Sequence, residues 1–333
     1  MKKAAVIILN WNGRKLIEKY LPSVVRNTPP EQARIVVADN ASTDGSVEWV
    51  CQAYPEVAVI RFRENYGFAG GYNRAIEEVE EEIVVLLNSD VEVGEQWLDP
   101  LLAVLEKEPD VMAVQPKIKA WKDKQRFEYA GACGGYVDRW GFPFCRGRIL
   151  NTVEQDKGQY DTEREVFWCS GAALCIRRAD YLRAGGLDER FFAHMEEIDL
   201  CWRLRRKGGR LKVCPEAVVY HLGGGSLPMN HPHKLFLNYR NNLLMLYKNL
   251  DAKTWKSLLW KRRLLDMAAT ALFLLKGEIA NVKAVRKAYR EFGRMKAAYK
   301  HGNASLADKC VYQRSIVFRY YLKHVRFFSD LWK

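Results

Sequence analysis

Short apolar runs alternate with amphipathic stretches through the first third of the chain. Runs of strand length lie at residues 4–9, 34–38, 57–62, 83–87 and 111–115. Between them, apolar residues recur at helical spacing in residues 14–26, 45–53, 70–80 and 97–107. Strands that alternate with helices predict an α/β fold, in which helices cover both faces of a mostly parallel sheet.

The alternation stops at about residue 117. Glycine and aromatic residues predominate as far as residue 165, which predicts an irregular region with short antiparallel strands. Periodic patterns then return. They predict a strand within 166–177, a helix at 195–208, strands at 211–213 and 217–220, and helices from about 233 to 300.

Charge divides the chain into two parts. Residues 1–230 carry 31 Lys and Arg against 34 Asp and Glu, whereas residues 231–333 carry 22 against 6. We therefore expect a near-neutral body, residues 1–230, and a basic helical region, residues 231–333, that faces an anionic partner. Apolar residues beside Arg262 and Arg263 favour a membrane surface, although no segment approaches the roughly 20 apolar residues of a membrane span.

Four polar clusters follow the first four predicted strands. In an open α/β sheet the carboxyl ends of the strands form the ligand-binding edge, so these clusters should line one rim. Such a rim suits a nucleotide diphosphate. Asp39 would contact the base or ribose, unless it only forms a turn; glycines of the 65–73 loop would approach the ligand; and Asp90 would bind a divalent cation. The clusters are Asn10–Asn12, Asp39–Ser46, Asn65–Asn73 and Asn88–Asp90.

Two adjacent carboxylates begin the helix predicted at residues 195–208. Glu197 shares a helical stripe with Leu200, Cys201 and Leu204, which places its carboxylate at the edge of the protein interior. A carboxylate that is partly removed from water suits a general base. Glu196 lies on the adjacent face, where we expect a supporting role or a surface ion pair.

His221 ends the last predicted strand, in a glycine-rich loop. A histidine at such a position is usually structural, but this one ends its strand near the cation expected at Asp90, and imidazole is a common metal ligand. Asp90, His221, diphosphate oxygens and water would complete the shell of a Mn²⁺ or Mg²⁺ ion, and the histidine favours Mn²⁺.

Seven motifs between residues 6 and 226 resemble, in the expected order, those of the family 2 inverting glycosyltransferases, and specifically the rhamnosyltransferase-like branch of bacterial surface polysaccharide synthesis. The resemblance implies a GT-A fold, a Rossmann-like fold of nucleotide-diphospho-sugar transferases, followed here by a C-terminal helical region. The motifs are VIILNWNG, VVADNASTDGS, NYGFAGGYNRAI, LLNSDV, CSGAALCIRR, GGLDERFFAHMEEIDLCWRLRRKG and VYHLGGGS.

The resemblance also implies roles for single residues. Asp90 and His221 become metal ligands, with Asn88-Ser89-Asp90 as the counterpart of the family's DxD motif, and Glu197 becomes the catalytic base. Two positions depart from the family pattern: Glu196-Glu197 replaces the usual Glu-Asp, which leaves Glu196 as an alternative base, and Asn88 leaves a single carboxylate in the metal motif. The implied nucleotide site comprises Asn10, Asn12, Asp39, Asn65, Gly67, Asn88 and Ser89, and the implied sugar site comprises Trp168, Ser170 and Gly171.

The activity that the resemblance implies is metal-dependent, inverting sugar transfer. The favoured donor is dTDP-rhamnose, the alternative is a UDP-sugar, and the acceptor is a saccharide or lipid-linked saccharide of O-antigen, capsule or cell wall. The enzyme would be cytoplasmic, peripheral on the inner face of the bacterial plasma membrane, unless the basic region packs as a homodimer interface. A nucleotidyltransferase fits less well, because LNWNGRK poorly matches a Gly-rich basic loop, and no recognition motif supports nucleic-acid binding.

Overall fold

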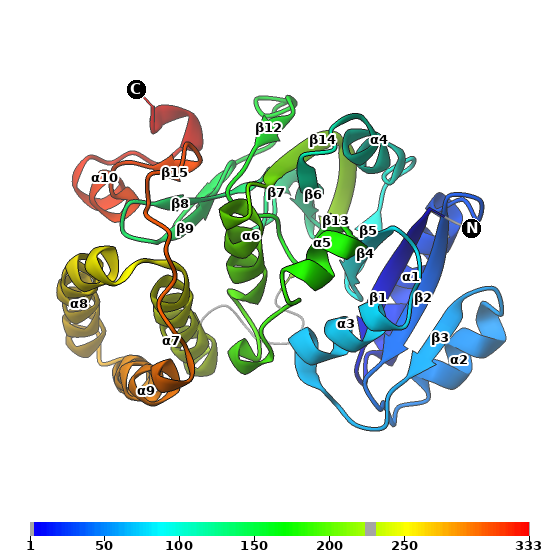
Figure 1. The fold of residues 1–333 in the computed structure, drawn as a ribbon, viewed down its shortest axis with the longest axis horizontal. Helices are drawn as coiled ribbons and strands as arrows, with labels where there is room; N and C mark the ends of the chain where they lie inside the picture. Colours follow the sequence, from blue (N-terminus) through cyan, green and yellow to red (C-terminus); the bar gives the residue numbers. More distant parts are fainter. Residues whose placement is uncertain (1–2, 224–230, 333) are drawn as a thin grey trace.

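The computed structural model describes residues 3–223 and 231–332. Ten strands form one central mixed sheet, whose central strands are flanked by helices (Figure 1). These strands are β1 (Ala4–Asn10), β2 (Ala33–Asp39), β3 (Ala58–Arg61), β4 (Ile83–Asn88), β5 (Val91–Val93), β6 (Val111–Ala120), β7 (Asp123–Phe127), β12 (Arg164–Glu165), β13 (Ala173–Arg177) and β14 (Arg210–His221).

Parallel pairs form the majority along the eight-stranded path of this sheet, four of seven, while β5 and β7 pair antiparallel outside that path. The order is β12-β14-β6-β13-β4-β1-β2-β3, with β5 paired to β14 and β7 to β6. Strands β3, β2, β1 and β4 pair in parallel, and so do β6 and β14, whereas β13 is antiparallel to both β4 and β6. The mostly parallel α/β sheet predicted from the sequence is therefore confirmed.

Alternate residues of each strand point to opposite faces, and each face has its own core. Ala5 and Ile7 of β1 contribute to the core that α3 and α6 cover, whereas Val6 and Ile8 contribute to the core under α1, α2 and α4. The helices that flank the sheet are α1 (Arg14–Asn27), α2 (Ser46–Ala53), α3 (Gly67–Glu77), α4 (Asp99–Lys107), α5 (Arg178–Arg183) and α6 (Glu196–Arg206).

The region from residue 117 to 165 supplies short strands, as predicted. A second sheet has the order β11-β10-β9-β8-β15, in which the last strand comes from the C-terminal part of the chain and runs parallel to β8. Its strands are β8 (Gly135–Asp138), β9 (Pro143–Cys145), β10 (Arg148–Ile149), β11 (Thr152–Val153) and β15 (Val311–Tyr312).

Helices make up most of the C-terminal part of the chain. In Figure 1, α7 (Pro232–Asn249) lies beside α6, between the main sheet and α8 (Ala252–Leu275), while α10 (Ile316–Leu322) lies near β8. Among the described residues, none of the helices combines the length and the apolar character needed to cross a membrane. The helices are α7 (Pro232–Asn249), α8 (Ala252–Leu275), α9 (Ile279–Met295) and α10 (Ile316–Leu322).

Three predicted boundaries change. Helix α3 begins at Gly67 rather than at residue 70. The strand predicted within 166–177 shortens to β13, because the backbone N–H of Cys169 faces the sulfur of Cys201 and that of Ser170 donates to Gln115, outside any ladder. The two strands predicted at 211–220 are one strand, β14, with irregular pairing between Cys214 and Val218.

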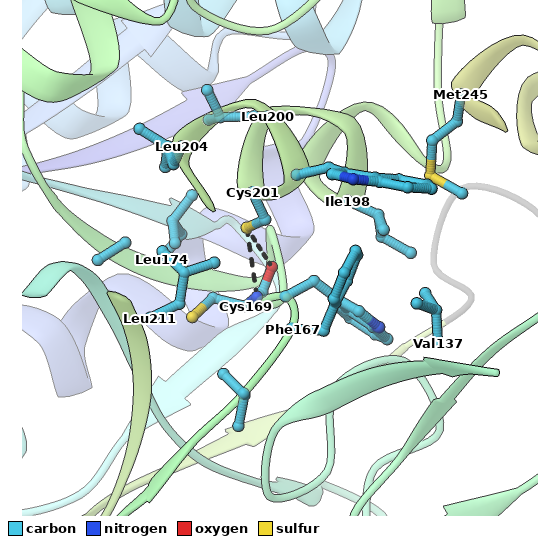
Figure 2. Close-up of a cluster of buried hydrophobic side chains, with 14 of the residues drawn as sticks. Val137, Phe167, Cys169, Leu174, Ile198, Leu200, Cys201, Leu204, Leu211 and Met245 are labelled. Atoms are coloured by element: carbon cyan, nitrogen blue, oxygen red, sulfur yellow. Dashed lines mark hydrogen bonds between the residues drawn. The ribbon is translucent and has the colours of Figure 1, made fainter. Parts of the chain in front are cut away.

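Helix α6 is anchored in the larger core. Figure 2 shows Ile198, Leu200, Cys201 and Leu204 of this helix pointing into a cluster that also contains Met245 of α7. The predicted inward stripe of α6 is thus confirmed, and the helix that carries Glu196 and Glu197 at its first turn is held by packing on both the sheet and α7.

Candidate active site

The parallel pairing of β1 and β2 brings the first two polar clusters together. Asn10 stands opposite Asp39 in the register, so both lie at the same edge. The side-chain amide of Asn10 donates to Asp39 Oδ1 at 2.9 Å, Ser42 Oγ at 3.1 Å and Ser46 Oγ at 2.8 Å. The second oxygen of Asp39 accepts from the backbone N–H of Ser42 at 2.9 Å. Both residues are buried, so the chain itself organises this edge before any ligand binds.

Asn12 extends this network toward solvent. Its backbone is left-handed, with a φ of 48°, and its side-chain oxygen accepts from the backbone N–H of Thr43 at 2.8 Å. The N–H of Asn12 donates to Ser42 at 2.9 Å. Beside it, Trp11 is 59% exposed. An exposed aromatic ring next to a fixed polar turn gives this edge a surface on which a planar base can stack.

The glycines of the 65–73 loop serve different purposes, whereas the sequence predicted one purpose for all of them. Asn65 accepts from the backbone N–H of Gly67 at 2.8 Å, and Asn40 donates to the carbonyl of Gly67 at 2.9 Å. Gly67 has a φ of 69°, and a Cβ there would meet no atom within 4 Å, so it is open to a ligand. A Cβ at Gly71, by contrast, would lie 2.6 Å from Leu9. The prediction that the glycines of this loop approach the ligand is wrong for Gly71, which lets α3 pack on the sheet.

The antiparallel pairing of β5 with β14 explains why Asp90 and His221 meet. His221 stands opposite Val91, and Asp90 Oδ1 lies 3.1 Å from His221 Nε2. Burial opposes ionisation of both groups, but each stabilises the other's charge, so the pKa of Asp90 falls while the pKa of His221 rises to about 10. The amide nitrogen of Asn88 lies 3.4 Å from the same Nε2, and Ser89 forms the partly exposed turn between Asn88 and Asp90. Gly224 to Ser226 of the predicted loop lie outside the described residues.

The Asp90–His221 pair fits a divalent cation. Two ligands at neighbouring corners of an octahedron, with bonds of about 2.1 Å, stand roughly 3.0 Å apart, which matches the 3.1 Å between Oδ1 and Nε2. Within residues 3–223 and 231–332, no three His, Cys, Asp or Glu side chains converge on one point. A cation held here would therefore take its remaining ligands from diphosphate oxygens and water, as Mg²⁺ and Mn²⁺ commonly do.

Glu128 is a residue of this site that the sequence did not reveal. It is buried, and its Oε1 lies 3.6 Å from His221 Nδ1, on the side of the ring away from Asp90. A metal-binding histidine usually donates its second N–H to a carboxylate or carbonyl, which fixes the ring. Glu128 follows β7 in the irregular region, where no periodic pattern marks it.

Glu196 and Glu197 form the other half of the site. Glu196 is buried, Glu197 stays partly exposed, and one carboxylate oxygen of each is buried without a hydrogen-bond partner. Burial raises the pKa of Glu197 to about 7. Burial and the charge of Glu197 raise the pKa of Glu196 well above its ordinary value. A carboxylate that titrates near neutral pH and keeps access to solvent is suited to accept a proton.

Of the three predicted sugar-site residues, only Gly171 lies against the side chain of Glu197. A Cβ at Gly171 would lie 3.5 Å from Glu197 and 3.6 Å from Phe68, so Gly171 leaves room beside both. Trp168 is buried and donates to the carbonyl of Tyr136 at 3.0 Å. Ser170 is buried and donates to the carbonyl of Ala130 at 2.7 Å. The structure therefore gives Trp168 and Ser170 internal partners and does not place them beside Glu197.

Charges from both halves of the site act on one buried thiol. The charges of Glu128 and Glu197 both act on the thiol of Cys145, whose pKa burial raises to about 11. Arg148 is also buried there, donates to the carbonyl of Tyr129 at 2.9 Å, and interacts with Glu128. Gly171, which lies against Glu197, precedes Ala172, whose carbonyl accepts from the backbone N–H of Asn88 at 3.0 Å. The amide nitrogen of Asn88 lies 3.4 Å from His221 Nε2, so Glu197 and His221 both border the C-terminal end of β4, although 24 positions separate them in the sequence.

Sequence comparison connects this geometry to known proteins. Glycosyl transferase family 2 matches residues 5–178. N-acetylglucosaminyl-diphospho-decaprenol L-rhamnosyltransferase of Mycobacterium tuberculosis is 28% identical over 259 residues, which cover 72% of this chain and 83% of that protein. Rhamnosyltransferase WbbL of Escherichia coli K12 is 25% identical over 225 residues, which cover 65% of this chain and 82% of that protein.

Solved structures confirm the fold. The crystal structure of GalNAc-T7 with UDP, GalNAc and Mn²⁺ superposes with a TM-score of 0.60 at 17% identity. The match covers 90% of this chain but 58% of that one, so this chain spans less than two thirds of its length. At that identity the likeness concerns the fold alone, and it confirms the predicted GT-A architecture.

Proposed function

The chain belongs to glycosyl transferase family 2, a family of inverting GT-A enzymes that use nucleotide sugars, and on that premise we propose that it is a rhamnosyltransferase. The proposed donor is dTDP-rhamnose. The proposed acceptor is a saccharide or lipid-linked saccharide of a bacterial cell-surface polysaccharide, such as O-antigen, capsule or cell wall. Two relatives that are named as rhamnosyltransferases support the choice of sugar.

One observation carries the proposal. The Asp90–His221 pair, which fits a divalent cation, and Glu197 both border the end of β4, where Asn88 lies 3.4 Å from His221 and bonds the residue after Gly171. A sugar whose diphosphate is held at the pair would present its anomeric carbon toward Glu197. Transfer with inversion requires this arrangement, because the leaving group and the attacking hydroxyl must lie on opposite sides of the reacting carbon.

In the proposed mechanism Glu197 accepts the proton of an acceptor hydroxyl while the hydroxyl oxygen attacks the anomeric carbon. Glu196, more deeply buried, supports Glu197 as its neighbouring carboxyl group, and burial together with the charge of Glu197 raises its pKa. Asp90 and His221 would hold a Mn²⁺ or Mg²⁺ ion, which when bound neutralises charge on the diphosphate leaving group. The bond from the anomeric carbon to the diphosphate oxygen breaks as the new glycosidic bond forms.

The nucleotide would bind along the first four strand ends. Asp39 would accept from the base through the edge that thymine and uracil share, with Asn10 fixing its orientation. Asn12, Asn65, Gly67, Asn88 and Ser89 would border the ribose and diphosphate. A UDP-sugar is the second candidate donor, because the structural relative GalNAc-T7 binds UDP in its crystal structure.

A donor screen tests the proposal. Thermal shifts would be measured with dTDP, UDP and GDP, each with and without Mn²⁺, and rhamnosyl transfer would be assayed with the nucleotides that bind. Ligands that bind the folded state raise its melting temperature. A Mn²⁺-dependent shift with dTDP, followed by rhamnosyl transfer, is expected. A shift with UDP alone would replace the rhamnose donor by a UDP-sugar, and no shift with any nucleotide would contradict the assigned site.

We also propose that α8 rests on the inner face of the membrane. One side of α8 packs on the protein through Trp255 and Leu258, whereas the opposite side carries an exposed apolar stripe. Basic residues border this stripe, as expected for a helix that contacts anionic lipid headgroups. The stripe comprises Trp260, Leu264, Met267, Leu274 and Leu275, and its basic neighbours include Lys256, Lys261 and Arg263.

Vesicle flotation tests this placement. The protein should float with vesicles that contain anionic phospholipid, and the double variant Leu264→Ser, Leu275→Ser should float at least tenfold less, because each buried CH₂ contributes roughly 0.8 kcal/mol. Leu182→Ser on α5 is the matched control, since Leu182 is also exposed but lies in the body of the protein. Equal flotation of all three proteins, or none with anionic vesicles, would contradict the placement.

A further inference from the structure

The backbone that leads into α6 is unusually constrained. We call residues 188–199 the entry segment, since it precedes and begins α6. Three of its residues other than glycine have left-handed backbones: Phe192 with a φ of 67°, His194 with 70° and Met195 with 75°. Non-glycine residues adopt such conformations only where surrounding structure imposes them. Met195 immediately precedes α6 and makes no side-chain capping bond, so something other than a cap must hold this turn.

Asn241 of α7 supplies that hold. Its side-chain amide donates to three carbonyls of the entry segment: Phe191 at 2.9 Å, Ala193 at 2.8 Å and His194 at 2.8 Å. Asn241 has 0% exposed surface, so water cannot replace these bonds. Each carbonyl belongs to the turn that carries the left-handed residues, and the amide therefore fixes the path of the backbone two residues before Glu196.

Arg240 determines which way this amide points. Its Nε donates to Asn241 Oδ1 at 2.8 Å, which leaves the NH₂ group facing the entry segment. Its Nη2 donates to the carbonyl of Phe191 at 2.8 Å. The two neighbouring side chains thus act as one unit, in which the guanidinium orients the amide and shares one of its acceptors.

The same helix holds the other end of the entry segment. Lys248 lies 2.8 Å from Asp188 and 2.8 Å from Asp199, and Asn249 donates to Asp199 at 2.8 Å. Glu197 therefore sits between two groups of contacts from α7. One oxygen of Glu197 is buried without a hydrogen-bond partner, so the position of its carboxylate depends on the backbone rather than on a side-chain partner.

We propose that Asn241, oriented by Arg240, is a positioning residue that sets the carboxylate of Glu197 for proton transfer. The proposal rests on the proposed role of Glu197 as base. Asn241 touches neither the nucleotide edge nor the Asp90–His221 pair in the described contacts, so its effect should fall on turnover and spare donor binding. Small displacements of a reacting group lower rates steeply, by about 100-fold for 1 Å.

The test compares two neighbouring asparagines of α7. Asn242 is also buried, donates to the carbonyl of Gly141 at 2.9 Å and accepts from Arg262 at 2.6 Å, and these side-chain hydrogen bonds lie outside the entry segment. Asn241→Leu and Asn242→Leu should both lower the melting temperature. Only Asn241→Leu should lower kcat, by about 10- to 100-fold, with the KM for donor within twofold of the wild type and faster amide hydrogen exchange in residues 193–198.

Three outcomes decide the matter. Equal loss of kcat in the two variants, or wild-type kcat in Asn241→Leu, would overturn the positioning role. If Asn241→Leu fails to fold, Arg240→Lys replaces it, since a lysine cannot reach both Asn241 and Phe191; its kcat should then fall with unchanged KM, and an unchanged kcat overturns the proposal. Glu197→Gln separates the two levels: if it retains turnover, the base assignment fails first, whatever Asn241→Leu shows.

Discussion

The β1–β2 edge and the entry segment hold their polar groups in opposite ways. At the edge, Asn10 and Asp39 satisfy each other through neighbouring loops, within about forty residues of the N-terminus. In the entry segment, Glu197 keeps an unpaired oxygen, and its backbone is held by α7, which begins 35 positions later. A binding surface can thus be completed locally, whereas a reactive carboxylate must stay under-satisfied and be held from a distance.

Removing the charge of Glu197 should produce the largest effect and separate the two regions. Glu197→Gln is expected to lower kcat by about 10³-fold, since general-base catalysis contributes about 10²–10⁴-fold. The thermal shift with nucleotide and Mn²⁺ should stay unchanged, because the β1–β2 edge is intact. Glu196→Gln is the control. A greater loss in Glu196→Gln than in Glu197→Gln would transfer the role of base to Glu196.

Breaking the β1–β2 edge should reverse that pattern. Asn10→Ala removes an amide with three partners, two of them buried, and is expected to reduce the free energy of unfolding by about 2–3 kcal/mol, together with a weaker nucleotide-dependent thermal shift. Urea denaturation measures the first quantity. Asn12→Ala, which loses exposed bonds, should change the free energy of unfolding by less than about 1 kcal/mol. Equal effects of the two substitutions would show that Asn10 does not organise the edge.

The smallest expected effect is that of pH on the kcat and the stability of the protein. Burial raises the pKa of Glu197 to about 7. A base must be deprotonated, so kcat should rise with pH through this value and be about tenfold lower at pH 6 than on the plateau. The stability term has the opposite sign: the protonated form is favoured in the folded protein, so this contribution is present below the unfolded pKa and is lost as pH rises through 7.

Measuring kcat and urea stability of wild type and Glu197→Gln across pH 5–9 checks both signs. The slope of stability against pH that belongs to Glu197 should disappear in the variant. A kcat that is flat across this range would show that proton removal by this carboxylate does not limit turnover.

Periodicity and motif order predicted the strands of the N-terminal half of the molecule well. The apolar run that ends at Asn88 became β4, and the polar tips of β1 and β2 lie side by side, because parallel strands end at one edge. The sequence indicated that His221 ends a strand near Asp90. It did not reveal that this strand pairs antiparallel with β5, which is what brings the two residues together. Pairing between distant strands leaves no trace in the local pattern of either one.

The rest of the site could not be predicted for a related reason. Glu128 lies in a region without a period, and Asn241 looks like an ordinary polar position of a basic helix until α7 is seen against the entry segment. Trp168 and Ser170 fall within a family motif, yet their side chains donate hydrogen bonds inside the protein, to the carbonyls of Tyr136 and Ala130. A motif specifies which residues belong together but not which of them face the ligand.

The contacts of α7 bear on how such enzymes could be recombined. The jump in charge after residue 230 invites a junction there for building chimaeras, but that junction would pair an entry segment with a foreign helix and lose the matching asparagine. A junction between Leu250 and Ala252 would keep α7 with its own α6, but it would exchange β15, which pairs with β8, together with the helices beyond α7. Grafts made at the later point would keep the contacts of α7 with the entry segment while replacing the exposed stripe of α8.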